Sequence, residues 1–372
     1  MTTYPLMIST ELTKESNVSL FPVMQEMNHE QVVFCHDQDT GLKAVIAIHN
    51  TVLGPSMGGT RMWKYTDDNE AVIDALRLSR GMTLKNSIAG LNIGGGKAVI
   101  IGDASKIKNE ALMRRFGKFV HSLGGKYYTA EDVNMNTRDM EYVRMETPYV
   151  TGLPESMGGA GDPSPFTAYG VYMGMKAAAK RAYGSESLEG RKILVQGAGQ
   201  VGTYLTGYLE KEKAKIYVSD LFENKVSTLA SKHKIQVVDP KSVFDQVMHI
   251  YAPCALGGTI NDQSIEQLTC DIVAGGANNQ LLDEKLHDQA LANKGILYAP
   301  DFLINGGGIT NVYYEYEGNY NRTRVMNHTE QIFDTTTQVF ELCDKQNSTP
   351  QMAAIELAEK RIRSIGNIKL NL

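Results

Sequence analysis

Lys85 and Lys97 are the residues whose types and spacing most directly suggest chemistry in this sequence. They flank a glycine-rich segment that ends in the run 94–96 (GGG), so two cations are separated by bare backbone. A small anion could dock between two such ammonium groups. Crowding and loss of solvent would push one of them toward the neutral form, which can accept a proton. The alternative is that both lysines are ordinary solvated surface charges.

The elements expected around the two lysines favour a site over a surface position. Lys85 shares one face of a helix predicted over 70–85, capped by Asp67 or Asp68, with the apolar side chain of Met82. Lys97 begins a short buried strand predicted over 98–101. Asp132 ends another strand, predicted over 126–130, and could bond the reacting group and shuttle protons; the alternative is a turn or helix-cap residue.

A second motif, 197–202 (GAGQVG), matches the pattern of a dinucleotide-binding loop. The pattern alone is weak evidence, because glycine turns between a strand and a helix are common. Here a strand is predicted before it over 192–196, a helix after it over 201–210, and the acidic residue Asp220 closes the next strand. A glycine turn that binds no ligand is the alternative interpretation.

Each residue of this loop would have a physical task. Gly197 would make the tight turn, Gly199 would let a pyrophosphate approach the backbone N–H groups, and Gly202 would let helix and strand pack closely. Asp220 would accept hydrogen bonds from the adenosine ribose. The residues after it, 221–223 (LFE), offer no cation for a 2′-phosphate, which favours NAD over NADP as the cofactor.

The chain is long enough, at 372 residues, to form two domains. We predict an α/β fold with a substrate and oligomerisation domain over 1–160, whose first 20 residues are an extension, and a doubly wound Rossmann NAD-binding domain over 161–335. Helices over 336–372 would pack back on the first domain, and the segment 158–165 would act as a hinge. The second domain is predicted from six short strands, 192–196, 215–219, 235–238, 249–252, 272–274 and 296–298.

Composition excludes several classes of function. A net charge of −5 gives no reason to bind nucleic acid, and no apolar run approaches the ~18 residues of a membrane span. The first residues do not form a secretory signal. The four cysteines are scattered, as in the reducing cytoplasm, and the eight histidines have no metal-binding spacing. We therefore expect a cytoplasmic protein that binds no nucleic acid, membrane or metal.

The sequence resembles the glutamate/leucine/phenylalanine/valine dehydrogenase family, and most closely its leucine-specific branch. The resemblance covers nearly everything from about residue 24 to residue 362. The matching stretches are 54–62 (GPSMGGTRM), 80–86 (RGMTLKN), 94–97 (GGGK), 130–133 (AEDV), 163–171 (PSPFTAYGV), 252–258 (APCALGG), 277–280 (ANNQ), 298–301 (YAPD) and 305–308 (NGGG).

The resemblance implies reversible, NAD-dependent oxidative deamination of an L-amino acid to a 2-oxo acid and ammonia. It assigns the substrate carboxylate to Lys85, the base that activates water to Lys97, and proton transfer at the amino group to Asp132, with the backbone of Gly58 and Gly59 holding the substrate. It implies that Thr167 and Asn279 orient the nicotinamide. Further cofactor-binding candidates in the motifs are Gln200, Val201, Cys254 and Ala255. The resemblance also implies a homo-oligomer, either an octamer or a dimer.

Substrate choice is predicted from positions that match the side-chain pocket of the family. These positions, with Met82, are apolar or neutral: Met57, Ala130, Thr151, Ile309 and Val312. Such a lining disfavours a charged glutamate side chain and fits leucine or another branched-chain amino acid. The alternatives are an enzyme that prefers phenylalanine or another aromatic amino acid, a non-catalytic NAD-binding homologue, and an enzyme with a folate-like substrate on a similar frame.

One segment departs from the family. Where relatives usually follow the catalytic acidic residue with Gly-Thr-Thr or Gly-Thr-Asn, this chain has 134–136 (NMN). Losing a glycine and a small hydroxyl beside Asp132 is expected to affect the backbone or the pocket there, and with it substrate preference and turnover.

Overall fold

A computed structural model of the chain describes residues 19–370. Within them the chain divides into two compact units, each built around its own sheet. The first unit takes the residues up to Asp162, Val312–Tyr320 and the residues from Ala358 onward, and the second takes Pro163–Asn311 and Asn321–Leu357. The extension predicted over 1–20 lies outside the described residues except for its last two. The domain boundaries predicted at 160/161 and 335/336 stay predictions.

The first unit is a mixed sheet with helices on both faces. Its elements are α1 (Leu20–Met27), β1 (Gln31–Asp37), β2 (Leu42–Asn50), β3 (Ser56–Met57), β4 (Thr60–Trp63), α2 (Asp68–Ile88), β5 (Gly94–Ile101), α3 (Ala104–Ile107), α4 (Glu110–Ser122), β6 (Tyr127–Tyr128), α5 (Thr137–Arg144) and the 3₁₀ turn Glu155–Met157. The strand order is β1-β2-β5-β3-β6, and β4 pairs with β5. β2 lies between β1 and β5 and is antiparallel to both, whereas β3 and β4 run parallel to β5.

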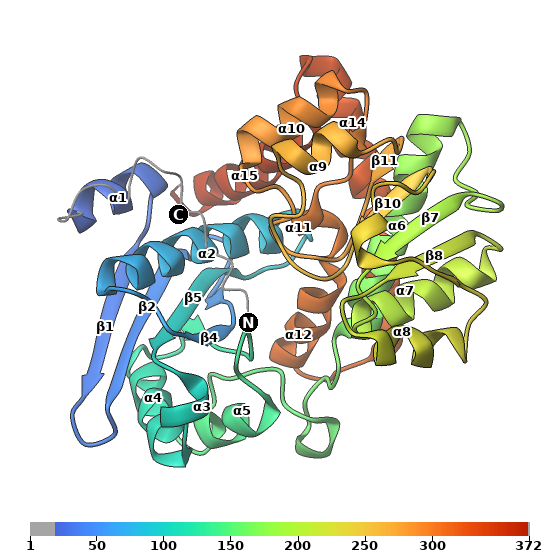
Figure 1. Cartoon of the computed structure of the whole chain (residues 1–372). Coiled ribbons are helices and arrows are strands. Elements are labelled where there is room, and N and C mark those ends of the chain that lie inside the picture. Colours follow the sequence, from blue (N-terminus) through green and yellow to red (C-terminus); the bar gives the residue numbers. More distant parts are fainter. Residues whose placement is uncertain (1–18, 371–372) are drawn as a thin grey trace. The chain divides into compact units, whose positions relative to one another are not determined.

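Alternation along β2 and β5 decides which side chains face which helix. Ala47 and Val99 join the apolar side chains of α2, whereas Ile46 and Ile100 join those of α4. Figure 1 shows α2 along one side of these strands and α4 on the other. Because successive side chains of a strand point to opposite faces, Lys97 shares the side of Val99. Lys97 and the helix that carries Lys85 therefore lie on the same side of the sheet.

The second unit is a parallel sheet flanked by helices. Its elements are α6 (Ser164–Tyr183), β7 (Lys192–Gln196), α7 (Gln200–Lys211), β8 (Lys215–Ser219), α8 (Glu223–Ala230), β9 (Gln236–Val237), the 3₁₀ turn Pro240–Ser242, β10 (Ile250–Pro253), α9 (Asp262–Gln267), β11 (Ile272–Val273), α10 (Glu284–Asn293), β12 (Leu297–Tyr298), α11 (Asp301–Ile304), α13 (Arg322–Glu330) and α14 (Ile332–Gln346). The order β12-β11-β10-β7-β8-β9, parallel throughout, is the dinucleotide-binding order in which the first strand is central. The predicted α/β fold class is confirmed.

The last helices divide between the two units. α13 and α14 pack on α6 of the second unit. Of the two remaining helices, α12 (Gly307–Glu317) and α15 (Pro350–Leu370), each continues along the chain from the second unit into the first. The return to the first unit is made by the later turns of α15, where Ser87 Oγ donates to the Ala358 carbonyl at 2.7 Å and Arg361 donates to the Leu91 carbonyl at 2.7 Å.

Two local predictions need correction. β5 begins at Gly94, so Lys97 lies inside a strand, because glycines without side chains can lie flat against neighbouring elements and continue the pairing with β2. The strand predicted over 126–130 is limited to Tyr127–Tyr128. Pro163 occupies the cap position of α6, and Ser164 is its first helical residue. None of the helices in residues 19–370 has the length and apolar character of a membrane span.

Candidate active site

Lys97 and Asp132 form an ion pair in the first unit. The ammonium nitrogen of Lys97 contacts Oδ2 of Asp132. The Lys97 side chain is 7% exposed and that of Asp132 is 24% exposed, so the pair is largely removed from water. The structure thus brings together two of the three residues that the sequence put forward for chemistry. An ammonium group next to a carboxylate can exchange protons with a molecule bound against it.

Arg61 is a second cation on the same carboxylate. Its Nε lies 3.5 Å from Oδ2 of Asp132, and its Nη1 lies 3.2 Å from Oδ2 of Asp74 on α2. The Tyr65 hydroxyl also donates to this Asp74 oxygen at 2.6 Å. Sequence reasoning quoted Arg61 only as part of a matching stretch and missed its contact. The signal was present, since an arginine two residues after the glycine pair stood in a stretch already assigned to substrate binding.

The two cations determine the charge of Asp132. Burial alone would raise the pKa of the Asp132 carboxyl, but the Lys97 ammonium and the Arg61 guanidinium outweigh burial and hold this pKa well below its usual range. Asp132 is therefore a carboxylate that accepts hydrogen bonds. The sequence predicted that repulsion between two ammonium groups would set the state of the reacting lysine. In the structure the group in contact with Lys97 is instead the Asp132 carboxylate, which also contacts Arg61.

The glycines of β5 let α2 lie close to the strand. A Cβ at Gly95 would lie 2.1 Å from Oγ1 and 2.2 Å from the backbone nitrogen of Thr83. Only a residue without a side chain fits at that distance. Lys85 follows Thr83 on α2 and is half-buried. The close approach of α2 therefore fixes the helix that carries Lys85 against the strand that carries Lys97.

Gly58 and Gly59 lie against the same group of residues. A Cβ at Gly59 would lie 3.0 Å from Cβ of Asp132, and one at Gly58 would lie 3.2 Å from Cγ of Met82 and 1.8 Å from the Gly96 carbonyl oxygen. The buried Tyr127 hydroxyl donates to the Gly58 carbonyl at 2.7 Å and holds this backbone in place. The structure thus brings Gly58, Gly59, Met82 and Asp132 together, and their role in substrate binding stays a prediction.

The candidate side-chain pocket is partly assembled by the first unit. Met57 and Thr151 are buried, and Ala130 is half-buried. The Thr151 N–H donates to the Thr129 carbonyl at 2.8 Å, so Thr151 lies beside the residue before Ala130. Val312 is buried and belongs to the first unit, whereas Ile309, earlier on α12, belongs to the second. The joint lining by all five positions stays a prediction.

Glu315 was missed by sequence reasoning and supports this region. Its carboxylate accepts hydrogen bonds from the backbone N–H groups of Gly152 at 3.1 Å, Leu153 at 3.3 Å and Ala160 at 2.9 Å. Burial raises the pKa of Glu315, and the three N–H donors oppose that rise. Glu315 lies on the same helix as Val312. It therefore ties the helix that bears one candidate pocket residue to the loop that follows Thr151.

The glycine loop of the second unit has the predicted geometry. Gly197 has φ of +117°, which favours glycine, and a Cβ at Gly202 would lie 2.0 Å from the Gly197 carbonyl oxygen. Gly199 caps α7, and no atom lies within 4 Å of the position of its missing Cβ. The start of α7 thus offers open space beside helix N–H groups, which fits a pyrophosphate.

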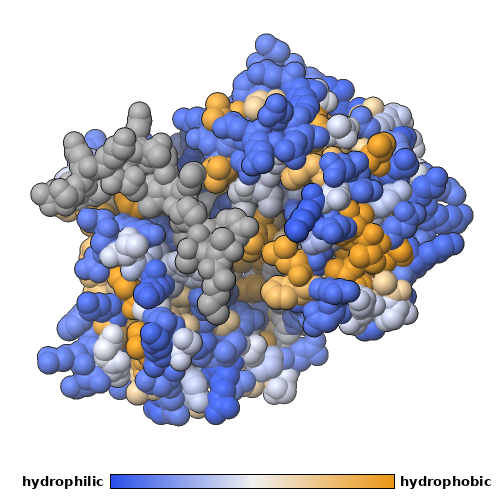
Figure 2. Space-filling model, in the orientation of Figure 1, coloured by the Kyte–Doolittle hydropathy of each residue, from blue (hydrophilic) through white to orange (hydrophobic). Residues whose placement is uncertain are grey.

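Asp220 closes the loop from the end of β8. Its Oδ2 accepts from the Ala198 N–H at 2.7 Å, and its Oδ1 accepts from the Phe222 N–H at 2.9 Å. A carboxylate oxygen has a second lone pair, so a ribose hydroxyl can still donate to it. Leu221 and Phe222 follow as exposed apolar residues, and Figure 2 shows hydrophobic patches on the viewed face of this unit.

The other cofactor candidates of the second unit follow the carboxyl ends of its strands or begin a helix. Gln200 is exposed at the start of α7, and Val201 beside it is half-buried. Cys254 and the exposed Ala255 follow β10, and burial raises the pKa of the Cys254 thiol to about 11. Asn279 is exposed with φ of +52°. Ligands of open parallel sheets bind at this edge.

Thr167, the remaining cofactor candidate, lies near the start of α6. Its hydroxyl donates to the Pro163 carbonyl at 3.1 Å. A Cβ at Gly308 would lie 2.4 Å from Thr167 Oγ1, so the glycine run 306–308 approaches this hydroxyl because Gly308 has no side chain there. The structure places Thr167 beside another of the matching stretches.

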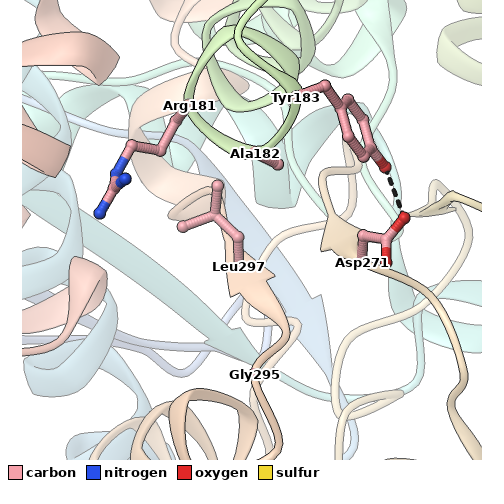
Figure 3. Close-up of a pocket in the computed structure, with 6 residues that line it drawn as sticks. All are labelled: Arg181, Ala182, Tyr183, Asp271, Gly295 and Leu297. Carbon is pink, nitrogen blue, oxygen red and sulfur yellow. Dashed lines mark hydrogen bonds between the residues drawn. The ribbon is translucent and has the colours of Figure 1, made fainter.

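A cavity of about 380 Å³ lies at the opposite edge of the same sheet. Asp271 precedes β11 and Gly295 precedes β12, and both line the cavity together with Leu297 and the residues 181–183 of α6. Figure 3 shows the Tyr183 hydroxyl pointing to the Asp271 carboxylate, to which it donates at 2.8 Å. No residue that the sequence put forward for binding or catalysis lines this cavity. It is therefore separate from the candidate site.

Comparisons with known proteins agree with this geometry. Residues 29–149 match the family model described as Glu/Leu/Phe/Val dehydrogenase, dimerisation domain, and residues 218–366 match Glutamate/Leucine/Phenylalanine/Valine dehydrogenase. A leucine dehydrogenase of Geobacillus stearothermophilus is 50% identical over 94% of this chain and 94% of its own length. An L-tryptophan dehydrogenase of Nostoc punctiforme is 44% identical over 93% of this chain and 96% of its own. A crystal structure of L-tryptophan dehydrogenase from Nostoc punctiforme has a TM-score of 0.83 at 43% identity and covers 93% of this chain and 99% of its own.

Proposed function

Since this chain belongs to the Glu/Leu/Phe/Val dehydrogenase family and is an amino-acid dehydrogenase, we propose that it deaminates an apolar L-amino acid with NAD. Amino acid, NAD⁺ and water give a 2-oxo acid, ammonium, NADH and a proton, reversibly. The observation that carries the proposal is the buried pair of Lys97 and Asp132 beside Gly58 and Gly59. This pair offers both a proton acceptor and a carboxylate to a molecule held by backbone groups.

The proposed roles follow from the chemistry of each group. Lys85 holds the substrate carboxylate, and Asp132 accepts a hydrogen bond from the substrate amino group. The cofactor, when bound, supplies the acceptor for the hydride of the substrate Cα. Lys97, once neutral, removes a proton from the water that adds to the resulting imine carbon. Collapse of that adduct releases ammonia and leaves the 2-oxo acid. The hinge motion over 158–165 stays part of the proposal and would exclude water.

Leucine or another branched-chain amino acid is the proposed substrate. The support is the neutral character of Met57, Ala130, Thr151 and Val312, because a charged substrate side chain needs a partner charge when it is buried. The 50% identity to a leucine dehydrogenase points the same way. An aromatic substrate is the second candidate, favoured by the name of the tryptophan enzyme at 44% identity. One or two methylenes change specificity by only ~1–3 kcal/mol.

The segment that departs from the family is compatible with catalysis. Asn134 has φ of +61°, a conformation that glycine adopts freely and that asparagine tolerates better than most residues. Its Nδ2 donates to the Met62 carbonyl at 2.9 Å, and the Lys108 ammonium donates to its carbonyl at 2.8 Å. Asn136 caps α5 in a capping box with Asp139. These contacts hold the loop after Asp132 and argue against the non-catalytic alternative.

NAD, rather than NADP, is the proposed cofactor. The support is Asp220 at the end of β8, because a 2′-phosphate would meet its carboxylate and the next three residues, 221–223 (LFE), supply no cation. We further propose a homo-oligomer, either a dimer or an octamer, supported by the dimerisation domain named in the family model. A cytoplasmic location and a role in the catabolism of branched-chain amino acids complete the proposal. The four free cysteines of the described residues suit a reducing compartment.

One assay tests the proposal directly. Appearance of NADH is followed at alkaline pH with a panel of L-amino acids that includes leucine, valine, isoleucine, phenylalanine, tryptophan and glutamate. We expect the highest kcat/KM with a branched-chain amino acid and none with glutamate. A preference for phenylalanine or tryptophan would establish the second candidate. No NADH with any amino acid of the panel would overturn the proposed activity.

A further inference from the structure

Arg61 lies where its charge can act on the reacting pair. β4 runs parallel to β5, and Arg61 is level with Val99 in the register. Neighbouring residues of paired strands share a face, so Arg61 points to the same side of the sheet as Lys97. There its guanidinium lies between two carboxylates, with Nε 3.5 Å from Asp132 Oδ2 and Nη1 3.2 Å from Asp74 Oδ2. Its side chain is only 16% exposed.

Lys97 and Arg61 share a single oxygen atom. Both contact Oδ2 of Asp132, one from β5 and the other from β4. Two cations on one carboxylate oxygen compete for its negative charge, and at low exposure solvent screens this competition weakly. The more charge Arg61 neutralises, the less remains to retain the proton on the Lys97 ammonium.

We propose that Arg61 is a positioning residue for the deamination: it fixes the Asp132 carboxylate and weakens the hold of that carboxylate on the Lys97 proton. This inference rests on the proposed function, in which Lys97 must be neutral before it can activate water. Arg61 acts through Asp132 and touches neither substrate nor cofactor in this scheme. Its effect is to make the neutral form of Lys97 available at lower pH.

Arg61 stays positively charged beside Asp132, and the neighbouring phenols stay neutral. Burial would lower the pKa of Arg61, but Asp132 and Asp74 raise it, so the guanidinium stays charged. Burial and Asp132 both raise the pKa of Tyr127 on β6, and burial and Asp74 raise that of Tyr65, so both phenols stay neutral. Glu131 precedes Asp132, and burial raises its pKa. α2, packed on β5, also carries Lys85.

A purely structural role makes a different prediction. Arg61 could serve only to join β4 to α2 through Asp74. Its loss would then lower stability and turnover but would leave the titration of Lys97 unchanged. The proposed role requires that the titration moves. The pH at which Lys97 loses its proton is therefore the quantity that separates the two.

That pH can be measured without any turnover. The full chain, without substrate, is treated with trace acetic anhydride from neutral to alkaline pH, and acetylation of the Lys97 peptide is quantified by mass spectrometry. Only the neutral amine reacts, so the midpoint of labelling reports the deprotonation of Lys97. The variants are Arg61→Gln, Arg61→Lys and Asp74→Asn. Arg114→Gln is the control, since Arg114 lies on α4, which covers the opposite face of the sheet, and forms its ion pairs with Glu110 and Glu146.

The expected shifts have opposite signs. Arg61→Gln leaves Asp132 to Lys97 alone and raises the midpoint by roughly one pH unit, since a charge at this range shifts a pKa by about 1–3 units. Asp74→Asn releases Arg61 toward Asp132 and lowers the midpoint. Arg61→Lys keeps the positive charge, so its labelling midpoint should stay near that of the unchanged protein. The acidic limb of kcat/KM against pH moves with the midpoint, and below it kcat/KM of Arg61→Gln falls about tenfold.

The outcomes decide the inference and the proposed function separately. If Arg61→Gln does not fold, Asp74→Asn still tests the coupling through its downward shift. Midpoints that stay at the unchanged value in every variant that folds would overturn the inference, even if turnover falls. If the unchanged protein oxidises no amino acid while the labelling midpoints shift as expected, the proposed function fails and the coupling of Arg61 to Lys97 stands.

Discussion

The imidazole rings of His29 and His49 meet edge to face, with their centroids 4.7 Å apart, where α1, β2 and α2 come together. Nε2 of His29 lies 3.0 Å from the Leu76 carbonyl oxygen. Nε2 of His49 donates to the Met27 carbonyl at 2.8 Å, and its Nδ1 lies 2.7 Å from the hydroxyl of Thr83. Burial lowers the pKa of both histidines from 6.5 to about 4, and His49 contributes further to the lowering at His29.

These lowered values predict a loss of stability in mild acid. In the folded chain both rings stay neutral down to about pH 4, whereas in the unfolded chain they take up protons below about pH 6.5. The unfolded state thus binds more protons in this window, so the free energy of unfolding is fully retained above pH 6.5 and falls as the pH drops toward 4. Thermal unfolding followed by circular dichroism from pH 7 to about pH 4.5 measures the fall.

A pair of variants isolates the histidines from other acid effects. His29→Asn with His49→Gln removes both titrating rings, and the slope of the melting temperature against pH in this window should become shallower. His36→Gln changes an exposed histidine on β1 and should leave the slope as it is. An unchanged slope in the double variant would contradict the assignment of the acid sensitivity to this ring pair.

Gly95→Ala should destabilise the first unit strongly. The new Cβ would lie 2.2 Å from the backbone nitrogen of Thr83, and a backbone contact cannot be relieved by a rotamer change. We expect a loss of about 3 kcal/mol or more in the free energy of unfolding, measured with urea. Gly81→Ala on α2 is the control, because its Cβ meets no atom within 4 Å and a helical alanine should stabilise by up to about 1 kcal/mol. Equal stabilities of the two variants would contradict the packing described here.

Asn134→Gly and Asn134→Ala should behave differently. Glycine keeps the left-handed backbone and loses only the bond to the Met62 carbonyl, so kcat/KM should stay within a few-fold of the unchanged enzyme. Alanine loses the bond and also bears a cost of about 1–2 kcal/mol at φ of +61°. We expect a lower melting temperature and a lower kcat for Asn134→Ala. Equal kinetics and stability of the two variants would show that this backbone conformation is unimportant for Asp132.

Asp220→Ala should weaken NAD binding and reduce the preference over NADP. The variant loses the acceptor proposed for the ribose hydroxyls and also frees the Ala198 N–H of the glycine loop. We expect the KM for NAD to rise about tenfold or more, with a smaller change for NADP, which no longer meets a carboxylate. The control is Glu223→Gln, an exposed acidic residue at the start of α8. A KM for NAD unchanged in Asp220→Ala would remove Asp220 from the cofactor site.

The sequence predicts those features that depend on local patterns. Asp67 caps α2 by accepting from the Glu70 N–H at 2.9 Å, and GAGQVG lies between β7 and α7 as expected. Gly59 and Asp132 are both assigned to the substrate site by the family resemblance, and the structure places them in contact. Such features need only a cap residue, a glycine spacing or a matching motif, all of which can be read along the chain.

Features that depend on strand register could not be read from the sequence. The contact of Arg61 with Asp132 requires that β4 runs parallel to β5 with Arg61 level with Val99. Strands as short as β3 and β6 have no periodicity to reveal them. Glu315 accepts a hydrogen bond from Gly152 although the two residues are far apart in the sequence. No local sequence pattern indicates that its carboxylate accepts from three backbone N–H groups. The ion pair between the Lys97 ammonium and the Asp132 carboxylate also joins two separate segments of the chain, and sequence reasoning did not predict it.

The most direct test of the account is the turnover of Lys97→Ala. NADH formation from L-leucine at alkaline pH is compared between this variant and the unchanged enzyme, and NADH binding is measured in parallel by fluorescence. We expect turnover to fall by about 10²–10⁴-fold or more, the usual contribution of a general base, while NADH still binds to the second unit. A Lys97→Ala enzyme that produces NADH at the unchanged rate would contradict the role of Lys97.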